Sequence, residues 1–584
     1  MKKQTKLVAV LSTAALLAIG ASMTSFAATG WAEEDGTWVY YDRNGDRVTD
    51  KWAKSGNNWY YLDESGEMAV DTLIEDGDNY YYVDVNGVMA ANQWVAIDNE
   101  DAGEDDEPEA YWYYFQANGK AMKNTTNKVA LKTINGKKYT FDDEGKMLYG
   151  WVSEDNEHYD NTDSDAFANA GVLYYFGDEN DGAMTTGWAL LDVTYDVVED
   201  NTYNAIAPVF TDDEDQSRWF YFQSNGKKVH SDSADKVKEK TINGKKYGFD
   251  QYGAMVAEWS VDVDRASNNG VDILGSKSDV IANKKSVSAK YAQQWRYFNN
   301  VEDGSKVSRG WFKVVSAEYL NDEKYEDDET DWYYAKGNGD LYAGVFKTIN
   351  GKKYAFRNDG RMINGLKFIK SSTTEDNLSV LADDNSSMPF DTEDAFLENA
   401  PKLDAKGYKC YYFGGSDDGA MRTNKTNITI DGDNYTFFFE KSGSKKGAGT
   451  TGIQDKKYYQ SGMLLSAGSD EKYQVVKTVK NGSSTTYTKL DDATKFLEEM
   501  QKNAATTKYA DVLTGKAEDA TITIGSVKKK AKDLKEAYVF TAGDDYHVVN
   551  TAGKVMEKSK SKDGNDYVYV TNSNGNIVGI YVED

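Results

Sequence analysis

The chain has 584 residues, a formal net charge of −29 at pH 7 and a single cysteine, Cys410. This acidic balance argues against nucleic acid and anionic lipid as partners, and one cysteine excludes an internal disulfide framework. The 50 glycines, 42 tyrosines and only 4 prolines are typical of strands joined by tight turns, so we expect an all-β protein that is stabilised by stacking.

The N-terminus has the pattern of a secretory signal peptide, predicted at residues 1–27. Three lysines lie within the first six residues, an uncharged run covers residues 7–19, and small residues precede a cleavage site after Ala27. The apolar run is too short for a membrane span, and no longer one follows. We therefore expect a secreted protein with no membrane span.

A unit of about twenty residues recurs from residue 30 onward. Residues 51–70 illustrate it, with an opening Trp52, an aromatic cluster at 59–61, a turn that ends at Gly66, and Met68. We predict that 59–62 is a strand and that 67–70 runs back beside it, which makes each unit a β-hairpin. Because a lone hairpin cannot bury both faces, the copies are expected to stack as a β-hairpin solenoid.

A longer repeat and a set of acidic inserts follow. The sequence KTINGKKY occurs at 132–139, 240–247 and 347–354, and each copy leads into a Gly-x-Met motif. The units between them carry inserts rich in Asp and Glu near residues 98–109, 154–170, 192–217, 260–291, 316–331 and 371–406. Charged runs are rarely buried, so these inserts are predicted to be exposed loops.

The repeats resemble the choline-binding, or cell-wall-binding, repeats of Gram-positive surface proteins. The residues that carry this resemblance are Thr-Gly-Trp at 186–188, Trp-Tyr-Tyr at 59–61, 112–114 and 332–334, and Asp-Gly-Ala-Met at 181–184 and 418–421. The form TINGKKY is also similar to repeats of clostridial toxins and of the glucan-binding regions of streptococcal glucosyltransferases. Repetition makes the resemblance specific over about three quarters of the chain.

The resemblance implies that aromatic rings of neighbouring hairpins form cages around the trimethylammonium group of choline on teichoic or lipoteichoic acid. A quaternary ammonium has no hydrogen-bond donor, so ring faces are the natural means of holding it. The clearest cages implied are Trp31 with Trp38 and Tyr61, and Trp52 with Trp59 and Tyr82. Further candidates are Trp94, Trp112, Trp151, Trp188, Trp219, Trp259, Trp295, Trp311 and Trp332. Alternating aromatic residues are equally needed as core whether or not a ligand binds.

No catalytic motif is recognised, so we expect no enzyme, no cofactor and no metal site. The three histidines, His158, His230 and His547, lie far apart in the sequence and form no zinc-binding pattern. Cys410 has no neighbouring histidine and stands at a strand position, where a structural thiol is expected.

The C-terminal region departs from the repeat, and we predict three segments: the signal peptide at 1–27, a repeat array at 28–468 and an α+β segment at 469–584. In the last segment, 473–479, 485–490 and 521–524 are predicted strands, while 491–501 and 526–537 are predicted helices. Degenerate hairpins near 546–556 and 567–575 are expected to cap the array.

Three functions remain open from the sequence. The first is a cell-wall-binding protein held by choline-bearing or similar wall polymers. The second is an adhesive module that reads wall or host glycans through the same aromatic faces. The third, and the least favoured, is a wall hydrolase with an unrecognised catalytic region.

Overall fold

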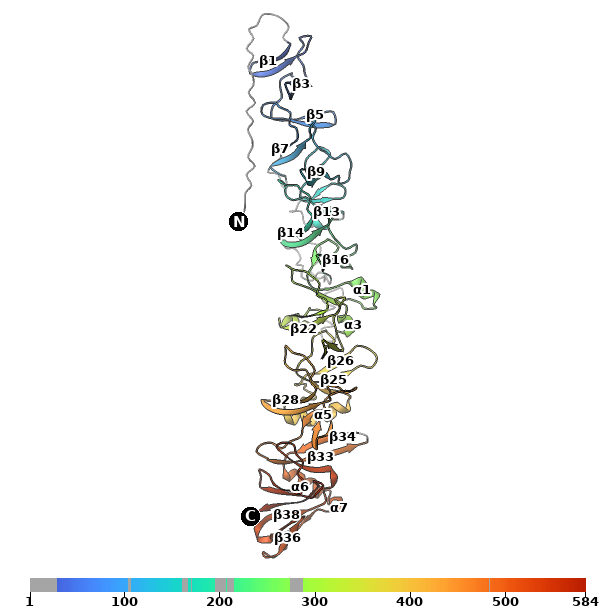
Figure 1. Ribbon diagram of the computed structural model, residues 1–584, viewed down its shortest axis with the longest axis vertical. Coiled ribbons are helices and arrows are strands. Elements are labelled where there is room, and N and C mark those ends of the chain that lie inside the picture. The colour runs from blue at the N-terminus through green and yellow to red at the C-terminus, as the bar shows by residue number, and fades with distance from the viewer. Residues whose placement is uncertain are drawn as a thin grey trace. The chain divides into compact units, whose positions relative to one another are not determined.

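The computed structural model describes residues 29–102, 107–159, 166–169, 171–194, 206, 215–273, 287–482 and 484–584. The protein is mostly β, and most strands pair antiparallel with the next strand in the sequence (Figure 1). The chain divides into two compact units, Met1–Thr194 with Asp215–Val229 and Tyr195–Glu214 with His230–Asp584. The predicted signal peptide lies outside the described residues, and the domain boundary at 468 stays a prediction.

The first unit is a succession of short hairpins. It contains one 3-10 helix, η1 (Ala166–Ala168). Its strands are β1 (Gly30–Glu34), β2 (Thr37–Tyr41), β3 (Lys51–Ser55), β4 (Asn58–Leu62), β5 (Thr72–Asp76), β6 (Asn79–Val83), β7 (Gln93–Asp98), β8 (Ala110–Phe115), β9 (Lys132–Ile134), β10 (Lys137–Tyr139), β11 (Trp151–Ser153), β12 (His158–Tyr159), β13 (Val172–Tyr175), β14 (Gly187–Thr194) and β15 (Asp215–Phe222).

The second unit combines hairpins with short helices. The helices are α1 (Val263–Asn268), α3 (Ala289–Ala292), α4 (Asp322–Glu326), α5 (Glu393–Ala405), α6 (Ala493–Lys502), α7 (Ala504–Thr507), η2 (Ala531–Asp533) and η3 (Gly543–Asp545). The strands are β16 (Lys238–Ile242), β17 (Lys245–Phe249), β18 (Met255–Val256), β19 (Glu258–Val261), β20 (Trp295–Phe298), β21 (Gly310–Val315), β22 (Thr330–Ala335), β23 (Phe346–Ile349), β24 (Lys352–Ala355), β25 (Leu366–Ser371), β26 (Leu378–Leu381), β27 (Lys409–Tyr412), β28 (Asn424–Ile430), β29 (Asp433–Phe439), β30 (Gly452–Gln454), β31 (Lys457–Gln460), β32 (Met463–Leu464), β33 (Tyr473–Asn481), β34 (Ser484–Leu490), β35 (Ala510–Asp511), β36 (Thr521–Ile524), β37 (Val527–Lys530), β38 (Leu534–Val539), β39 (Tyr546–Asn550), β40 (Lys560–Lys562), β41 (Tyr567–Thr571) and β42 (Ile577–Glu583).

The hairpin pairing differs from the sequence prediction. The aromatic strand β4 pairs along its whole length with β3, the strand of the opening tryptophan, across a turn at Gly56 and Asn57. The predicted return strand at 67–70 makes only isolated bridges, Met68 with Leu62 and Glu67 with Val39 of the preceding hairpin. The prediction was wrong because two turns flank the aromatic strand, and sequence pattern alone does not say which of them closes a ladder of hydrogen bonds.

Successive hairpins are joined through the residue that ends the repeat. The main-chain N–H of Met68 donates to the carbonyl oxygen of Trp38 in the preceding hairpin at 2.7 Å, and Met89 donates to Trp59 at 2.9 Å. The same hydrogen bond recurs from Met147 to Trp112 and from Met362 to Trp332. At these four steps the repeat therefore couples a hairpin to the one before it through the backbone.

At least four of the acidic inserts contribute to the core, so the prediction that they are exposed loops was wrong for them. The insert at 154–170 contributes buried Phe167 on η1. The insert at 260–291 contains α1 and contributes buried Tyr291, and the insert at 316–331 contributes buried Tyr319 and Leu320. The insert at 371–406 forms β26 and α5. Charge composition hid the few apolar residues that each insert buries.

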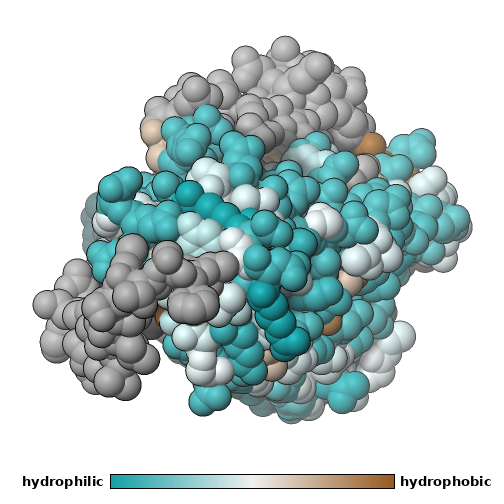
Figure 2. All heavy atoms as spheres, turned by 90° about the horizontal axis from the view of Figure 1, so that it is seen from above, coloured by the Kyte–Doolittle hydropathy of each residue, from teal (hydrophilic) through white to brown (hydrophobic). Residues whose placement is uncertain are grey.

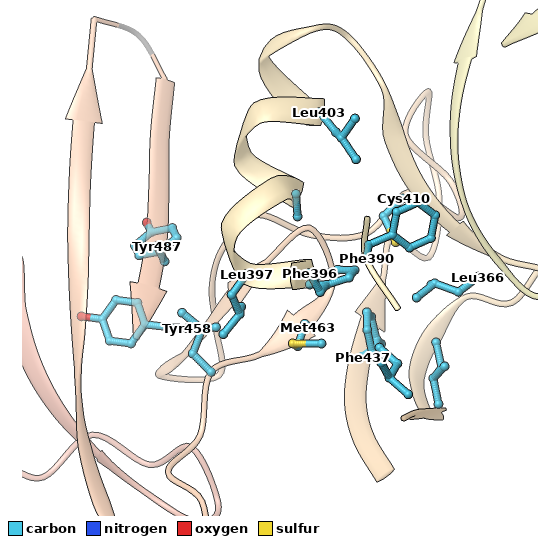
Figure 3. Packing of buried hydrophobic residues seen from close by; sticks show 14 of the residues in the cluster. Leu366, Phe390, Phe396, Leu397, Leu403, Cys410, Phe437, Tyr458, Met463 and Tyr487 are labelled. Atoms are coloured by element: carbon cyan, nitrogen blue, oxygen red, sulfur yellow. The ribbon is translucent and has the colours of Figure 1, made fainter. Parts of the chain in front are cut away.

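The helix α5 lies in one of the largest hydrophobic clusters of the second unit (Figure 3). Phe396 is fully buried and its ring packs against Phe368 and Phe437 at centroid distances of 5.7 and 5.5 Å. Cys410 is a free thiol in the same cluster, and burial raises its pKa well above the ordinary value. The expected structural role of Cys410 fits this position, since a buried thiol with a raised pKa is a poor nucleophile.

The C-terminal segment matches the predicted elements except for one helix. Strands β33, β34 and β36 cover the predicted ranges, and α6 buries Ala493, Phe496, Leu497 and Met500 on one face. Residues 526–537 were predicted to be helical, but they form β37, η2 and the start of β38. Ile522, Ile524 and Val527 are buried together there, so packing of a hairpin overrides a helical propensity.

Candidate ligand-binding site: aromatic clusters between hairpins

Each opening tryptophan lies opposite a tyrosine of its own hairpin. Trp31 is in register with Tyr40, and their ring centroids are 5.3 Å apart. Trp52 and Tyr61 are paired in the same way at 5.2 Å. Directly opposite residues of an antiparallel pair point to the same face, so the hairpin register fixes this contact. The pair recurs at Trp94 with Tyr114, Trp151 with Tyr175, Trp188 with Tyr221, Trp259 with Tyr297 and Trp311 with Tyr334.

A third ring comes from the next hairpin. The ring of Trp31 is 5.2 Å from that of Tyr60, and the ring of Trp52 is 4.9 Å from that of Tyr81. Tyr60 and Tyr81 each point to the face of their strand that is opposite to the face of the next residue along it. This face is turned toward the preceding hairpin. Equivalent contacts join Trp94 to Tyr139, Trp151 to Phe220, Trp259 to Tyr333 and Trp311 to Tyr354. A cluster of three rings thus forms at each of these steps.

The composition of these clusters differs from the cages inferred from the sequence. The resemblance grouped Trp31 with Tyr61, whereas the nearest ring from the next hairpin is that of Tyr60. Tyr61 contacts Trp52, in the following cluster. The sequence analysis also did not name Tyr40 as a partner of Trp31. The alternation of side chains along the aromatic strand was the sequence signal that Tyr60 and Tyr61 lie on opposite faces.

Two clusters also bring the strand tryptophan against the opening tryptophan. Trp188 and Trp219 have centroids 6.2 Å apart and ring planes at 90°, and Trp311 and Trp332 are 6.3 Å apart at 87°. All four side chains are partly exposed. Two perpendicular and partly exposed rings make a corner that a small cation can approach.

Three candidates lie in the core instead. Trp151 is 1% exposed, Trp295 is 0% exposed and Trp259 is 6% exposed. Trp259 donates its indole N–H to the carbonyl oxygen of Val315 at 2.8 Å. Their faces are covered by other protein groups, so these side chains act in packing.

The remaining candidates lie on partly exposed strand faces. Trp38 is partly buried on β2, and Trp59 on β4 is 40% exposed. Trp112 on β8 donates its indole N–H to Asn180 at 3.4 Å. Tyr82 stacks on Phe115 at 6.1 Å and donates a hydrogen bond to Asp71. Burial and this hydrogen bond raise the pKa of the Tyr82 hydroxyl, which stays neutral.

Carboxylates and lysines surround the aromatic faces. The indole N–H of Trp332 donates to Asp417 at 2.9 Å, and this bond together with Lys313 lowers the pKa of the Asp417 carboxyl. The Lys313 ammonium is 2.9 Å from Asp417 and 5.9 Å from the Trp332 ring centroid. Lys54 lies 5.6 Å from the ring centroid of Trp59. Both ring faces therefore already carry a cation from the chain itself.

Within the described ranges, no group of three or more His, Cys, Asp or Glu side chains is placed to hold a metal ion. No helix among the described residues is long and apolar enough to cross a membrane.

Comparison with known protein families identifies the repeat. The family model described as choline-binding repeat matches residues 28–73 and 52–94. Residues 28–94 carry choline-binding repeats. The matched hairpins are β1 to β6, which contain the clusters around Trp31 and Trp52.

Relatives extend the similarity beyond these repeats. The chain is 29% identical over 365 residues to "Glucosyltransferase-S" of Streptococcus mutans serotype c, an alignment that covers 59% of this chain and 22% of the relative. The chain thus spans about a fifth of the length of that relative.

Two solved structures from Streptococcus pneumoniae are also similar. The modular autolysin LytC shares 16% identity, with 59% of this chain and 55% of that chain covered and a TM-score of 0.28. Choline binding protein F shares 16% identity, with 71% and 98% covered and a TM-score of 0.23.

Proposed function

We propose that the protein is a secreted cell-wall-binding protein, held non-covalently on choline-bearing teichoic acid or a similar wall polymer through its aromatic clusters. The observation that carries the proposal is the right-angled pair Trp311 and Trp332, whose faces adjoin Tyr354 and a bound lysine ammonium. Ring faces that already accept a primary ammonium are suited to a quaternary one, which loses less hydration on binding.

Repetition turns weak sites into firm attachment. Each cluster offers two or three rings, and a cation on exposed rings gains only about 0.5–1 kcal/mol from each. A polymer that repeats its own ligand engages several clusters of one chain, so avidity exceeds single-site affinity by orders of magnitude. The backbone link between hairpins supports the further proposal that they stack as a β-solenoid, which would present the clusters in a row.

The proposed function includes export and a division of labour along the chain. The lysine-rich, apolar pattern of residues 1–27 supports a signal peptide, and residues 28–468 form the proposed array, with 469–584 as its α+β end. We propose that the chain binds and does not catalyse. Release of soluble fragments from purified cell walls by the isolated protein would contradict this part of the proposal.

The test of the function is retention of residues 28–584 on a choline-bearing matrix in about 1 M salt, where charges are screened beyond about 3 Å. Elution by free choline but not by more salt is the expected result. Trp332→Ala should elute at lower choline concentration than the wild type, whereas Tyr325→Ala should not, because Tyr325 is an exposed ring on α4 outside the clusters. Failure of choline to elute the wild type would overturn the proposal.

A glycan is the second candidate ligand. The alignment over 365 residues with a protein named as a glucosyltransferase favours it, since aromatic faces also stack on sugar rings. In that case an oligosaccharide of glucose, and not choline, should compete for binding.

A further inference from the structure

A polar pocket lies in the second unit, next to the buried core that contains Trp259 and Tyr333. Its volume is 440 Å³, and its lining includes Asn321 and Glu323 at the start of α4, Arg357 and Arg361 in the turn after β24, and Val380 on β26. Pockets of about 300–1,000 Å³ are typical of small-molecule sites. Three of the inserts, at 260–291, 316–331 and 371–406, contribute to its walls.

Most charges in this pocket are satisfied within the protein. The guanidinium of Arg361 is 2.9 Å from Asp359 and 3.3 Å from Asp331. Asp359 also accepts a hydrogen bond from the amide of Asn321 at 2.9 Å. These three ionised groups, one guanidinium and two carboxylates, therefore form a network within the protein, which carries a net charge of −1 beside Arg357.

Arg357 is the exception. Its guanidinium lines the pocket and has no hydrogen bond or salt bridge to any residue that the structure describes. Burial lowers the pKa of Arg357, and the neighbouring Arg361 adds repulsion. The carboxylates of Asp359 and Asp331 attract the guanidinium without forming a salt bridge to it. A guanidinium offers five N–H donors in a planar fork that matches a carboxylate or a phosphate, and leaving such a charge partly desolvated and unpaired is unfavourable.

Glu323 supplies a free group of opposite charge in the same pocket. Its carboxylate lies on the exposed side of α4 and makes no salt bridge to Arg357 or to any other described residue. The two groups line one pocket without meeting, so a ligand with an oxyanion at one end and hydroxyl donors at the other could engage both. A monosaccharide that carries an acidic group has this chemistry.

We propose that the pocket binds an acidic sugar, with Arg357 holding its oxyanion in a bidentate manner and Glu323 accepting hydrogen bonds from its hydroxyl groups. The shared chemistry is a carboxylate or a phosphate on a polyhydroxyl ring. The lining of the pocket includes no tryptophan or tyrosine of the aromatic clusters, so binding there can be measured separately from choline binding.

Calorimetric titration of residues 28–584 with glucuronate, glucose 6-phosphate and neutral glucose tests the proposal. One of the two acids should bind and glucose should not, which also decides between carboxylate and phosphate. Arg357→Gln should weaken the binding at least about tenfold, as expected for loss of charge-assisted hydrogen bonds. Arg43→Gln, at an exposed turn of the first unit, should leave it unchanged.

Two further measurements keep the test decisive if Arg357→Gln does not fold. Glu323→Gln changes an exposed side chain and should weaken the binding several-fold. On the wild type, the bound acid should protect Arg357 from modification by phenylglyoxal, as read by peptide mass spectrometry. Absence of binding by both acids up to about 10 mM, well above a weak Kd of about 1 mM, would overturn the proposal. Equal binding of the acid by wild type and Glu323→Gln, with Arg357 unprotected, would also overturn it.

Discussion

At the scale of single residues, lysine side chains decide which tryptophan faces are open to an external cation. Residues opposite the strand tryptophan share its face, and at two hairpins this residue is a lysine, Lys54 opposite Trp59 and Lys313 opposite Trp332. At the first hairpin the corresponding residue is Glu33, opposite Trp38. The three hairpins are therefore not equivalent. At two of them a lysine ammonium of the chain itself competes with an external cation for the face of the strand tryptophan. At the first hairpin a carboxylate lies opposite the strand tryptophan instead.

Replacing Lys54 tests this competition. Lys54→Ala should raise the affinity for choline about two- to fivefold, because an exposed cation–π contact of about 0.5–1 kcal/mol no longer competes. The measurement is the choline concentration that displaces the protein from a choline matrix. Lys51→Ala is the matched control, since Lys51 is exposed on the other face of β3. Equal shifts for both variants would mean that only net charge matters.

At the scale of the hairpin, glycine and methionine of successive repeats fit one another. Gly119 has a φ of +80°, and a Cβ built there would lie 2.3 Å from the sulfur of Met89. The Gly-x-Met motif therefore has a mechanical role, because the methionine of one repeat packs on the glycine of the next, and any side chain at the glycine would push the hairpins apart.

Gly119→Ala should destabilise the first unit by about 2–4 kcal/mol, through left-handed backbone strain and overpacking together. Gly136→Ala is the control, since Gly136 has a φ of +84° with nothing within 4 Å of a new Cβ. Urea unfolding monitored by circular dichroism measures both. The added cost at Gly119 should shrink in a Met89→Ala background; an unchanged cost would show that packing against Met89 is not its source.

The turn at Asp142 gives a hairpin-level dependence on pH. Burial raises the pKa of Asp142 to about 6, although its carboxylate accepts hydrogen bonds from the N–H groups of Glu144 and Lys146. Its folded pKa lies above the ordinary 3.8, so the folded state binds more protons between these values. Stability from this group is full below pH 3.8 and is lost as the pH rises toward 6.

Asp142→Asn keeps the acceptor oxygen and removes the ionisation. The variant should gain about 1–3 kcal/mol relative to the wild type as the pH rises from 4 to 7. Asp42→Asn changes the equivalent turn of the first hairpin, where backbone hydrogen bonds lower the carboxyl pKa below 3.8, so its stability relative to the wild type should be nearly constant from pH 4 to 7 and should rise only as the pH falls below 3.8. Thermal unfolding midpoints across both pH ranges check the two expectations, and parallel curves for the two variants would refute the assignment.

At the scale of the whole molecule, an acidic surface and two separate units define the protein. The face seen in Figure 2 is mainly hydrophilic where its residues are described. All thirteen tryptophans lie between residues 31 and 332, while the core around α5 and the C-terminal strands contain none. Tryptophan fluorescence therefore reports on residues 31–332, and a signal from the whole backbone reports on the C-terminal strands as well.

Unfolding should accordingly depend on the probe. Tryptophan fluorescence follows only residues 31–332, whereas far-ultraviolet circular dichroism follows the whole chain, so the two thermal transitions should not coincide. Phe396→Ala, which opens the core around α5 at a cost of about 3–5 kcal/mol, should shift mainly the dichroism transition. Coincident curves in both proteins would indicate a single cooperative unit.

The sequence by itself determined the repeat, its β character, the strands of the C-terminal segment and the helix α6, because these follow from local patterns of apolar and turn residues. It also placed the opening and strand tryptophans on hairpins. Only the tertiary structure decided which turn closes each hairpin, that Tyr60 and not Tyr61 meets Trp31, and that α5 is buried within an acidic insert. These depend on register and on contacts between residues distant in sequence, and a shift of one residue in register turns a side chain to the opposite face.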